Sequence, residues 1–444
     1  MRKRKIKWLS SVAITASILL PVVVLGYAQI GHDSDDEAIN YLKSVSNDPI
    51  SKLQKDIESG AVKLKYDSNH GYLPSVLKAL GIPISSQVLV FSKTSFQHTH
   101  ISPQTPRAVY FNDHTYIGWV QGGDYLEIST TDPQLGGVFY LLPQQPDAKP
   151  KFKRQTFECL QCHDGSMTKG VPGHIMRSVY ARVDGQPDFR AGSYLTSDQS
   201  VMEERWGGWY VTGTHGGQRH MGNMFTRNAE HPDEVDRDSG ANVTSLKRYC
   251  DTTPYLAPGS DIVALMILEH ETNVHNLITR ANYQTRIALN YERMLNKELG
   301  RGENYRAEST MSRIKSVCDP LISALLFSKE APLAGPVKGT ATFAAQFAAK
   351  GVKDKAGRSL RDLDLGTRLF KYPCSFLIYS DSFNGLPAIA KDYIYTRILQ
   401  ILNAGNSNPE FAHFDTPTRK AILDILIATK PDFAAFAASG KTKT

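Results

Sequence analysis

Alternating apolar and polar positions dominate the chain between residues 87 and 142. Five short runs there are rich in Val, Ile, Tyr, Phe and Trp, and Asn-Asp, Gly-Gly and Asp-Pro turns separate them: 87–93, 107–112, 115–121, 125–130 and 138–142. A period of two that is broken by turn residues is typical of antiparallel strands. The pattern predicts an antiparallel sheet or a small barrel.

Helical patterns lie on both sides of these strands. Two short ones precede them, at 49–58 and 74–80, and Gly81-Ile82-Pro83 stops the second. A run without Pro or Gly extends from 261 to 298 behind Ser260, which we expect to be its N-cap, and Gly300 ends it. Further helices are predicted at 309–327, 342–350, 386–402 and 417–429, the last capped by Asp415 or Thr416.

Residues 164–250 are rich in Gly, Trp, Arg and His and have little periodicity, which predicts ordered loops around a cofactor. A proline-rich linker at 143–150 precedes them. The chain therefore divides into a leader at 1–28, a β-rich region at 29–150, a loop-rich region at 151–257 and a helical region at 258–444. The predicted fold class is α+β, and the length is typical of two or three domains.

The leader has the pattern of a secretory signal peptide. Five basic residues lie within 1–7, an apolar run follows at 9–25, and Gly26-Tyr27-Ala28 offers small residues for cleavage. The apolar run exceeds the usual ~7–15 residues, so an uncleaved membrane anchor is the alternative. We expect the protein to lie in the periplasm, with the chain either free or held at the inner membrane.

Without the leader the formal net charge falls from +7 to +2 (46 basic against 44 acidic residues), which gives no case for nucleic-acid binding.

The string Cys159-Leu160-Gln161-Cys162-His163 is the strongest chemical signal in the chain. C-x-x-C-H is the attachment pattern of a c-type haem: two thiols add to the haem vinyl groups, and the histidine binds the iron as proximal ligand. From the composition, about 0.002 such strings are expected by chance. A zinc site is the alternative, but it normally needs a second Cys/His pair, and Cys250, Cys318 and Cys374 stand alone. These three are either one disulfide and a free thiol or three buried thiols.

The ligand on the other face of the iron would be sought first in residues 214–224. Met221 or His220, with His215 behind them, are the distal candidates, because they lie on a glycine-rich backbone that can approach a flat macrocycle. The alternative is that they are surface-loop residues. Met167, His174 and Met176 are less favoured, because reaching the opposite face of the haem usually needs a longer excursion of the chain.

Two further groups of residues are candidates for contact with the cofactor. Trp206 and Trp209 could pack on the porphyrin, and Arg205, Arg177 or Arg219 could pair with its propionates; the alternative is an aromatic core under the loops. On the long helix, Glu269-His270-Glu271 and His275 could supply an acid or a base. Glu271 and His275 are four residues apart and share a helix face, whereas His270 and His275 diverge.

At residues 159–163 the chain resembles the c-type cytochrome superfamily. Residues 205–213, 220–223 and 358–365 are similar to those of a group of large exported proteins with a single cytochrome c haem. The resemblance implies one covalent haem, electron transfer and a redox partner protein or membrane complex, and it brings no known substrate. One C-x-x-C-H instead of two separates the chain from bacterial dihaem peroxidases.

Three functions follow as hypotheses. The first is a periplasmic electron carrier whose iron is bound by His163 and a distal residue. The second is a haem oxidoreductase with an open distal site that uses His270, Glu271 or His275 as acid or base. The third is an exported protein without haem that binds zinc. The size of the chain, far beyond what one haem requires, motivates the second.

Overall fold

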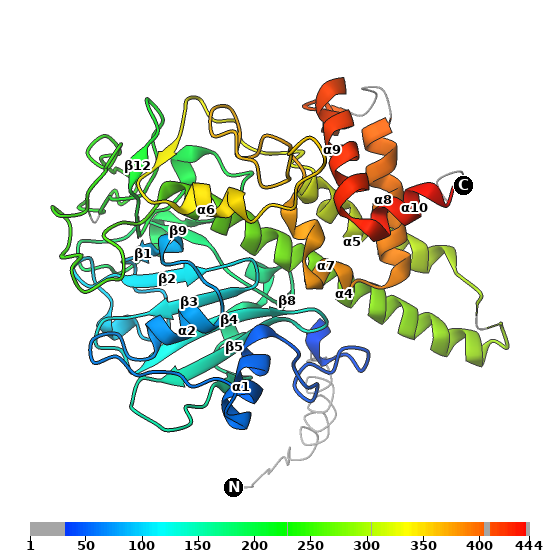
Figure 1. Cartoon of the computed structure of the whole chain (residues 1–444), viewed down its shortest axis with the longest axis horizontal. Coiled ribbons are helices and arrows are strands. Elements are labelled where there is room, and N and C mark those ends of the chain that lie inside the picture. The colour runs from blue at the N-terminus through cyan, green and yellow to red at the C-terminus, as the bar shows by residue number, and fades with distance from the viewer. Residues whose placement is uncertain (1–31, 229, 303, 404–408, 441–444) are drawn as a thin grey trace, which may run out of the picture.

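The computed structural model describes residues 32–228, 230–302, 304–403 and 409–440 (Figure 1). The predicted leader at 1–28 lies outside these residues. No helix within the described ranges is long and apolar enough to cross a membrane. The predicted α+β class is confirmed, with strands in the N-terminal half and helices in the C-terminal part.

A seven-stranded antiparallel sheet forms the N-terminal half, in the order β11-β1-β2-β3-β4-β5-β6. The five predicted runs form consecutive neighbours in it, and two short strands from the loop-rich region join its edges. The strands are β1 (Val88–Val90), β2 (Arg107–Phe111), β3 (Thr115–Trp119), β4 (Tyr125–Asp132), β5 (Gly136–Pro143), β6 (Lys153–Gln155) and β11 (Trp209–Tyr210). The sheet is open, so the sheet alternative of the prediction holds and the barrel does not.

The two faces of the sheet are covered by different elements. Helices α1 (Pro49–Ser59) and α2 (Leu73–Ala79) pack on the face that carries Ile117, Leu126 and Val138. Asp48 caps α1 by accepting hydrogen bonds from the backbone of Ile50 and Ser51. The opposite face contributes Val109, Phe111 and Tyr116 to a cluster with the long helix.

That long helix is α4 (Ile262–Glu298), which runs from the sheet past the C-terminal helices (Figure 1). Its N-cap is Asp261, not the predicted Ser260: the Asp261 side chain accepts from the backbone of Val263 and Ala264, whereas the Ser260 hydroxyl donates to the carbonyl of Tyr210. All residues from Ile262 to Glu271 are buried. A helix buried on every side at this end lies between two layers rather than on a surface.

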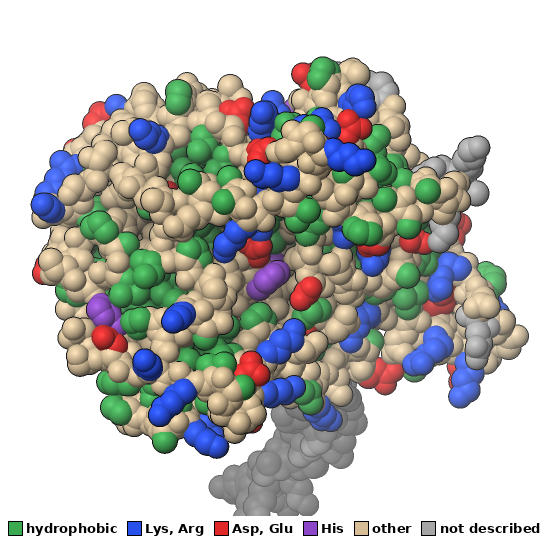
Figure 2. All heavy atoms as spheres, in the orientation of Figure 1, with side chains coloured by type: hydrophobic (Ala, Val, Ile, Leu, Met, Phe, Trp, Pro, Cys, Tyr) green, Lys and Arg blue, Asp and Glu red, His purple; other side chains and the backbone are tan. Residues whose placement is uncertain are grey.

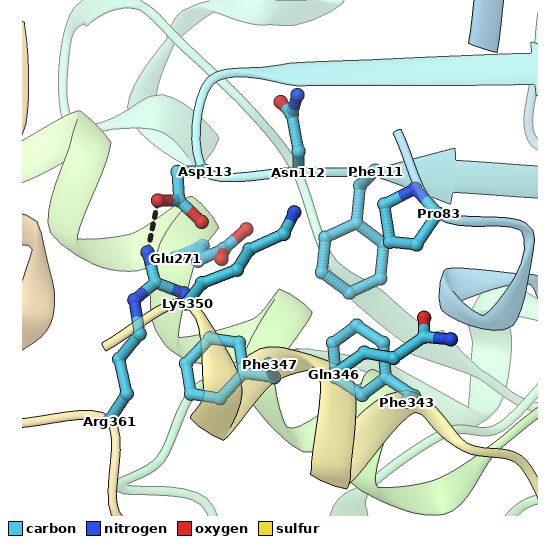
Figure 3. Close-up of a pocket in the computed structure, with 10 residues that line it drawn as sticks. All are labelled: Pro83, Phe111, Asn112, Asp113, Glu271, Phe343, Gln346, Phe347, Lys350 and Arg361. Atoms are coloured by element: carbon cyan, nitrogen blue, oxygen red, sulfur yellow. Dashed lines mark hydrogen bonds and ion pairs between the residues drawn. The ribbon is translucent and has the colours of Figure 1, made fainter. Parts of the chain in front are cut away.

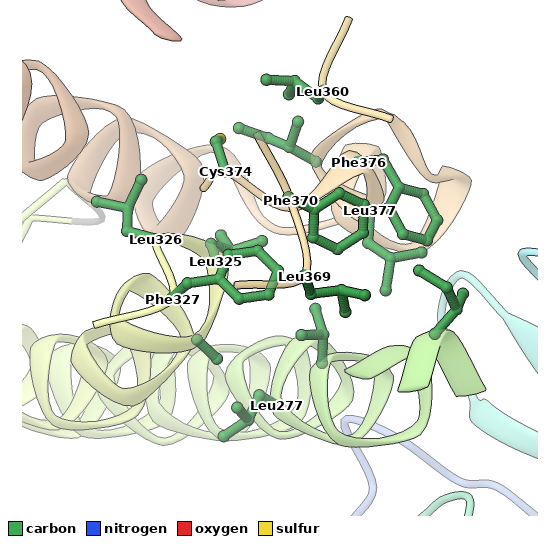
Figure 4. Close-up of a cluster of buried hydrophobic side chains, with 14 of the residues drawn as sticks. Leu277, Leu325, Leu326, Phe327, Leu360, Leu369, Phe370, Cys374, Phe376 and Leu377 are labelled. Atoms are coloured by element: carbon green, nitrogen blue, oxygen red, sulfur yellow. The ribbon is translucent and has the colours of Figure 1, made fainter. Parts of the chain in front are cut away.

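The remaining helices pack beyond α4. They are α5 (Glu308–Leu325), α6 (Phe343–Ala349), α7 (Asp381–Asn384), α8 (Ala388–Asn403), α9 (Thr416–Thr429) and α10 (Pro431–Ala438). Asp415 caps α9, as one of the two predicted candidates. Figure 4 shows how Leu277 of α4 meets apolar side chains of the segment 325–377. This cluster also includes Val88, Val109 and Trp209, so the predicted regions share one core.

One helical turn and three small strand pairs shape the loop-rich region between sheet and helices. The motif itself forms α3 (Leu160–His163), a single turn that includes the histidine. Three small antiparallel pairs fix the loops: β7 (Asp164–Gly165) with β8 (Val171–Pro172), β9 (Arg177–Val179) with β10 (Ser193–Leu195), and β12 (Gly213–Thr214) with β13 (Lys338–Gly339). On the surface, Lys/Arg and Asp/Glu side chains are interspersed, in keeping with the small net charge of the chain without its leader (Figure 2).

Candidate haem site

A cavity of about 410 Å³ lies between the sheet and α4, and both cysteines and the histidine of the motif line it. Its walls include strands β2 to β5, the turn of α3, the segments 94–96 and 174–177, Met167, Trp209, and Leu268 and Thr272 of α4. Volumes of this size are typical of cofactor sites. The cavity thus joins a flat sheet surface to the two thiols.

The local geometry of the motif brings the two sulfur atoms to one opening. Cys159 precedes the single turn of α3, and the backbone N–H of His163 donates to its carbonyl at 2.9 Å. Both thiols are free; Cys159 is half-buried and Cys162 is exposed. Burial, followed by the nearby Glu127 carboxylate, raises the pKa of Cys159 to about 12. Cys159 is therefore a neutral thiol, and both cysteines line one cavity.

The ring of His163 is fixed by its backbone surroundings. Its Nδ1–H donates to the carbonyl of Gly173 at 2.8 Å, while the N–H of Gly173 donates to the carbonyl of His163 at 2.9 Å. Nε2 has no hydrogen-bond partner among the described residues, and burial lowers the pKa of the imidazole. A neutral ring with Nδ1–H held by a carbonyl is the arrangement that metal-binding histidines use, because it leaves the Nε2 lone pair available.

The sheet presents both polar and apolar side chains to the cavity and an apolar face to the core on its other side. Arg107 and Glu127 form an ion pair at 2.7 Å that crosses over Gly118, whose missing side chain leaves room for the arginine. Ser129 of β4 and Phe139 of β5 continue this face, and the Phe139 ring lies 4.7 Å from that of His163. Alternation along each strand therefore separates cavity residues from core residues.

Tyr116 and His174 close the inner end of the cavity. Their rings lie 4.7 Å apart. His174 is held at both nitrogens, by Ser129 Oγ at 2.6 Å and Thr131 Oγ1 at 3.0 Å, so it has no free nitrogen for a metal. The Tyr116 hydroxyl is buried without a partner in the described part of the chain, and burial raises its pKa well above the usual value. A buried, unpaired hydroxyl on the wall of a cavity is suited to a bound group.

Of the residues predicted to contact the cofactor, the structure brings Cys159, Cys162, His163 and Trp209 together at the cavity. The Trp209 indole N–H donates to the carbonyl of Arg177, which lines the cavity too. The Arg177 guanidinium donates to Ser193 Oγ and lies over the Phe189 ring. It is therefore the arginine suited to an acidic group of the cofactor on this side.

Other predicted residues lie elsewhere. Arg205 is buried in an ion pair with Glu269 at 3.2 Å and donates to the carbonyls of Asp198 and Ser200. Trp206 is fully buried against His220, with ring centroids 5.3 Å apart. None of these residues lines the cavity.

The three distal candidates also lie off the cavity. His215 and His220 pack on each other at 4.7 Å, and His220 Nδ1 accepts from the backbone of Gly222. Met221 accepts from Ser178 Oγ at 3.7 Å. Ligation by any of the three would need a different placement of this segment. The thioethers at the cavity are instead Met167 and Met176, the residues that sequence spacing had disfavoured.

The acid and base candidates of α4 have separate surroundings. His270 donates from Nδ1 to Asp198 at 3.1 Å and accepts from the Ser375 hydroxyl at 2.7 Å, fully buried against Phe327. His275 donates from Nε2 to the carbonyl of Asp113 at 2.8 Å. Burial lowers the pKa of His275 to about 4, so the ring is neutral.

The sequence analysis did not single out the individual sheet residues of this site. Arg107, Glu127 and Ser129 occupy the polar positions of strands whose other face is apolar, and that alternation was the available signal. The zinc alternative requires a group of three or more His, Cys, Asp or Glu side chains that could hold a metal ion. The described residues contain no such group. Cys250, Cys318 and Cys374 are buried free thiols, one of the two arrangements left open by the sequence.

Comparison with known proteins adds no identification. No family model, no curated protein and no solved structure matches this chain.

Proposed function

We propose that this chain is an exported monohaem c-type cytochrome that carries electrons through a haem bound covalently at Cys159 and Cys162. One observation carries the proposal: the two thiols and His163 of the motif line the same cavity, and the Nδ1–H of His163 is held by a backbone carbonyl. The residues present fit the group, because they offer two attachment thiols and a nitrogen ligand of fixed tautomer.

The chain's own residues would have distinct tasks. His163 binds the iron and Gly173 orients its ring. Apolar side chains that include Val109, Phe139 and Leu268 exclude water from the macrocycle. Bound haem supplies a one-electron ferric/ferrous couple, and the partner would be a redox protein or membrane complex reached in the periplasm. Export itself is supported by the leader pattern alone.

Met176 or Met167 would supply a further ligand to the iron, since both line the cavity. Met176 is 3% exposed and its flexible thioether lies in the cavity wall. A methionine ligand raises the haem potential relative to histidine, which suits an electron carrier.

A haem oxidoreductase is the second candidate, and the unpaired Tyr116 hydroxyl favours it. A buried phenol in the cavity could donate a hydrogen bond to a small molecule on the iron. Electron paramagnetic resonance of the ferric protein separates the two candidates. A six-coordinate low-spin signal supports the carrier, and a five-coordinate high-spin signal supports the oxidoreductase.

The decisive experiment is a pyridine haemochrome assay on protein produced with the haem-attachment machinery. The expected spectrum is that of a haem with two thioether bonds, at one haem per chain. The C159A/C162A double variant should lose covalent haem, and Cys250→Ala, at a buried thiol away from the cavity, should keep it. No covalent haem in the parent protein would reject both candidates.

A further inference from the structure

A small hollow on the surface lies close to the haem cavity, on the other side of a wall made by α4 and the β2–β3 turn. It is lined by Asp113, Glu271, Lys350 and Arg361 and by the rings of Phe343 and Phe347 (Figure 3). Its volume of about 10 Å³ is roughly that needed for one water molecule. Asp113 and Arg361 form an ion pair at the solvent-facing side.

Glu271 is the unexplained group of this hollow. Its side chain is 1% exposed, and Oε2 has no hydrogen-bond partner among the described residues. Figure 3 shows its carboxyl group next to the Asp113–Arg361 pair and the Lys350 side chain. Burial, reinforced by the Asp113 charge, raises the pKa of Glu271 well above its usual range, although Arg361 and Lys350 oppose this. A buried carboxyl with a water-sized space beside it can exchange protons with solvent.

Residues that are close together in sequence line the two spaces from opposite sides of the wall between them. Glu271 lines the hollow, whereas its neighbour Thr272 lines the haem cavity. On the sheet side, Phe111 lines the hollow and Tyr116 lines the cavity, with their rings stacked at 6.3 Å. After burial, the Glu271 charge is the largest cause of the raised pKa of Tyr116. The carboxyl group is therefore electrostatically coupled to the cavity wall.

Several charged or titratable groups surround Glu271 on the elements packed against it. Asp113 and His114 come from the β2–β3 turn, Tyr116 from β3, Lys350 from the end of α6, Arg361 from the following loop, and His270 and His275 from α4 itself. Arg361 is held in place by Asp113 and by the Phe347 and Phe376 rings. His275 is neutral near pH 7, because burial lowers its pKa to about 4. Glu271 is the buried, unpaired carboxyl of this group.

We propose that Glu271 is a redox-linked proton site of the haem cavity, an inference that rests on the proposed function. When the cofactor gains one electron from its redox partner, the Glu271 carboxylate takes up one proton from bulk water through the surface hollow. On oxidation the electron leaves to the acceptor and the proton returns to water. Charge in the buried region is thereby balanced, which is the physical reason for the coupling: an added negative charge favours the protonated form of a nearby acid.

The test is the haem midpoint potential as a function of pH, measured in the parent protein and in two variants. Glu271→Gln keeps the shape of the side chain and removes its titration. Glu330→Gln is the matched control, since Glu330 is a half-buried carboxyl with a pKa raised to about 7 that lines neither space. We expect the parent potential to fall with rising pH, by up to about 59 mV per tenfold change in proton concentration for one proton per electron. The slope should vanish in the Glu271→Gln variant and persist in the control.

Redox-induced infrared difference spectra give an independent readout on the same samples. A protonated-carboxyl band should appear on reduction of the parent protein and be missing in the Glu271→Gln variant. Haem with a pH-independent potential, or a slope unchanged by the substitution, would overturn this inference and leave the proposed function intact. Absence of thioether haem would overturn both.

Discussion

A single methyl group added at Gly173 should weaken both the fold and the proposed iron ligation. Gly173 accepts the hydrogen bond from His163 Nδ1, so its backbone position sets the orientation of that ring. A Cβ atom at Gly173 would lie 2.8 Å from Asn276 Cγ, closer than real Cβ atoms approach, and 3.1 Å from Thr168 Cβ, tighter than most real contacts. Something must therefore move in the Gly173→Ala variant.

The cost can be worked from the contacts that would be lost. Asn276 accepts from the backbone N–H of His174 and donates to its carbonyl, both at 2.8 Å. Rotating Asn276 away breaks two hydrogen bonds of about 0.5–1.5 kcal/mol each. Moving the backbone instead carries the about 1–3 kcal/mol typical of overpacking. Either response predicts roughly 1–3 kcal/mol off the free energy of unfolding, together with a looser His163.

Equilibrium denaturant unfolding measures the first effect, and the ferric electron paramagnetic resonance spectrum measures the second. Gly165→Ala is the matched control, because Gly165 lies in the same loop, has extended backbone and has no atom within 4 Å of an added Cβ. The control should stay within about 0.5 kcal/mol of the parent protein. An equally small effect at Gly173, with an unchanged spectrum, would refute the assignment of Gly173 as the residue that positions His163.

Four further predictions concern other parts of the molecule. Met176→Ala should convert the ferric haem toward high spin, whereas Met221→Ala should leave its spin state unchanged. The opposite result would restore Met221 as distal ligand. Glu330→Gln should remove a pH dependence of stability: burial raises the pKa of this carboxyl to about 7, so its contribution is fully present below pH ~4.5 and is lost as the pH rises through 7, by about 3 kcal/mol at most. If the urea midpoint falls by the same amount between pH 5 and pH 8 in the parent protein and in the variant, this prediction is contradicted. His270→Ala should cost about 3–5 kcal/mol in unfolding free energy, because it leaves Asp198 and Ser375 buried without their shared partner. Since Ser375 is fully buried, a fluorophosphonate probe should leave it unlabelled in the native protein, and labelling would show that this Ser-His-Asp arrangement opens to solvent.

The sequence predicted those features that depend on neighbouring residues. Period-two alternation located the strands of the sheet, and the absence of Pro and Gly located α4, because both signals follow from local backbone geometry. The cap of α4 was misplaced by one residue. Ser260 and Asp261 both suit an N-cap, and the choice was decided by the bond from Ser260 to Tyr210, fifty residues earlier.

The candidate site shows the same division between features that neighbouring residues determine and features that depend on tertiary packing. The C-x-x-C-H string predicts the proposed chemistry of the site within five residues, since attachment and ligation groups are adjacent in that pattern. The distal side has no such constraint, and the expected longer excursion of the chain on a glycine-rich backbone led to the prediction of His215, His220 and Met221, which lie off the cavity. A strand edge, a loop and a helix far apart in the chain meet at the cavity: Tyr116, Met176 and Thr272 are neighbours only there.

By itself, then, the sequence determined the α+β class, the positions of most elements and the three residues expected to hold a haem. Only the tertiary structure decided which side chains surround those three, that the polar face of the sheet forms the cavity wall, and that Glu271 lies beside it. The physical reason is the distance along the chain over which each effect acts. Propensity, capping and attachment chemistry act between residues that are close in sequence, whereas a cavity forms where segments distant in sequence pack together and leave space unfilled.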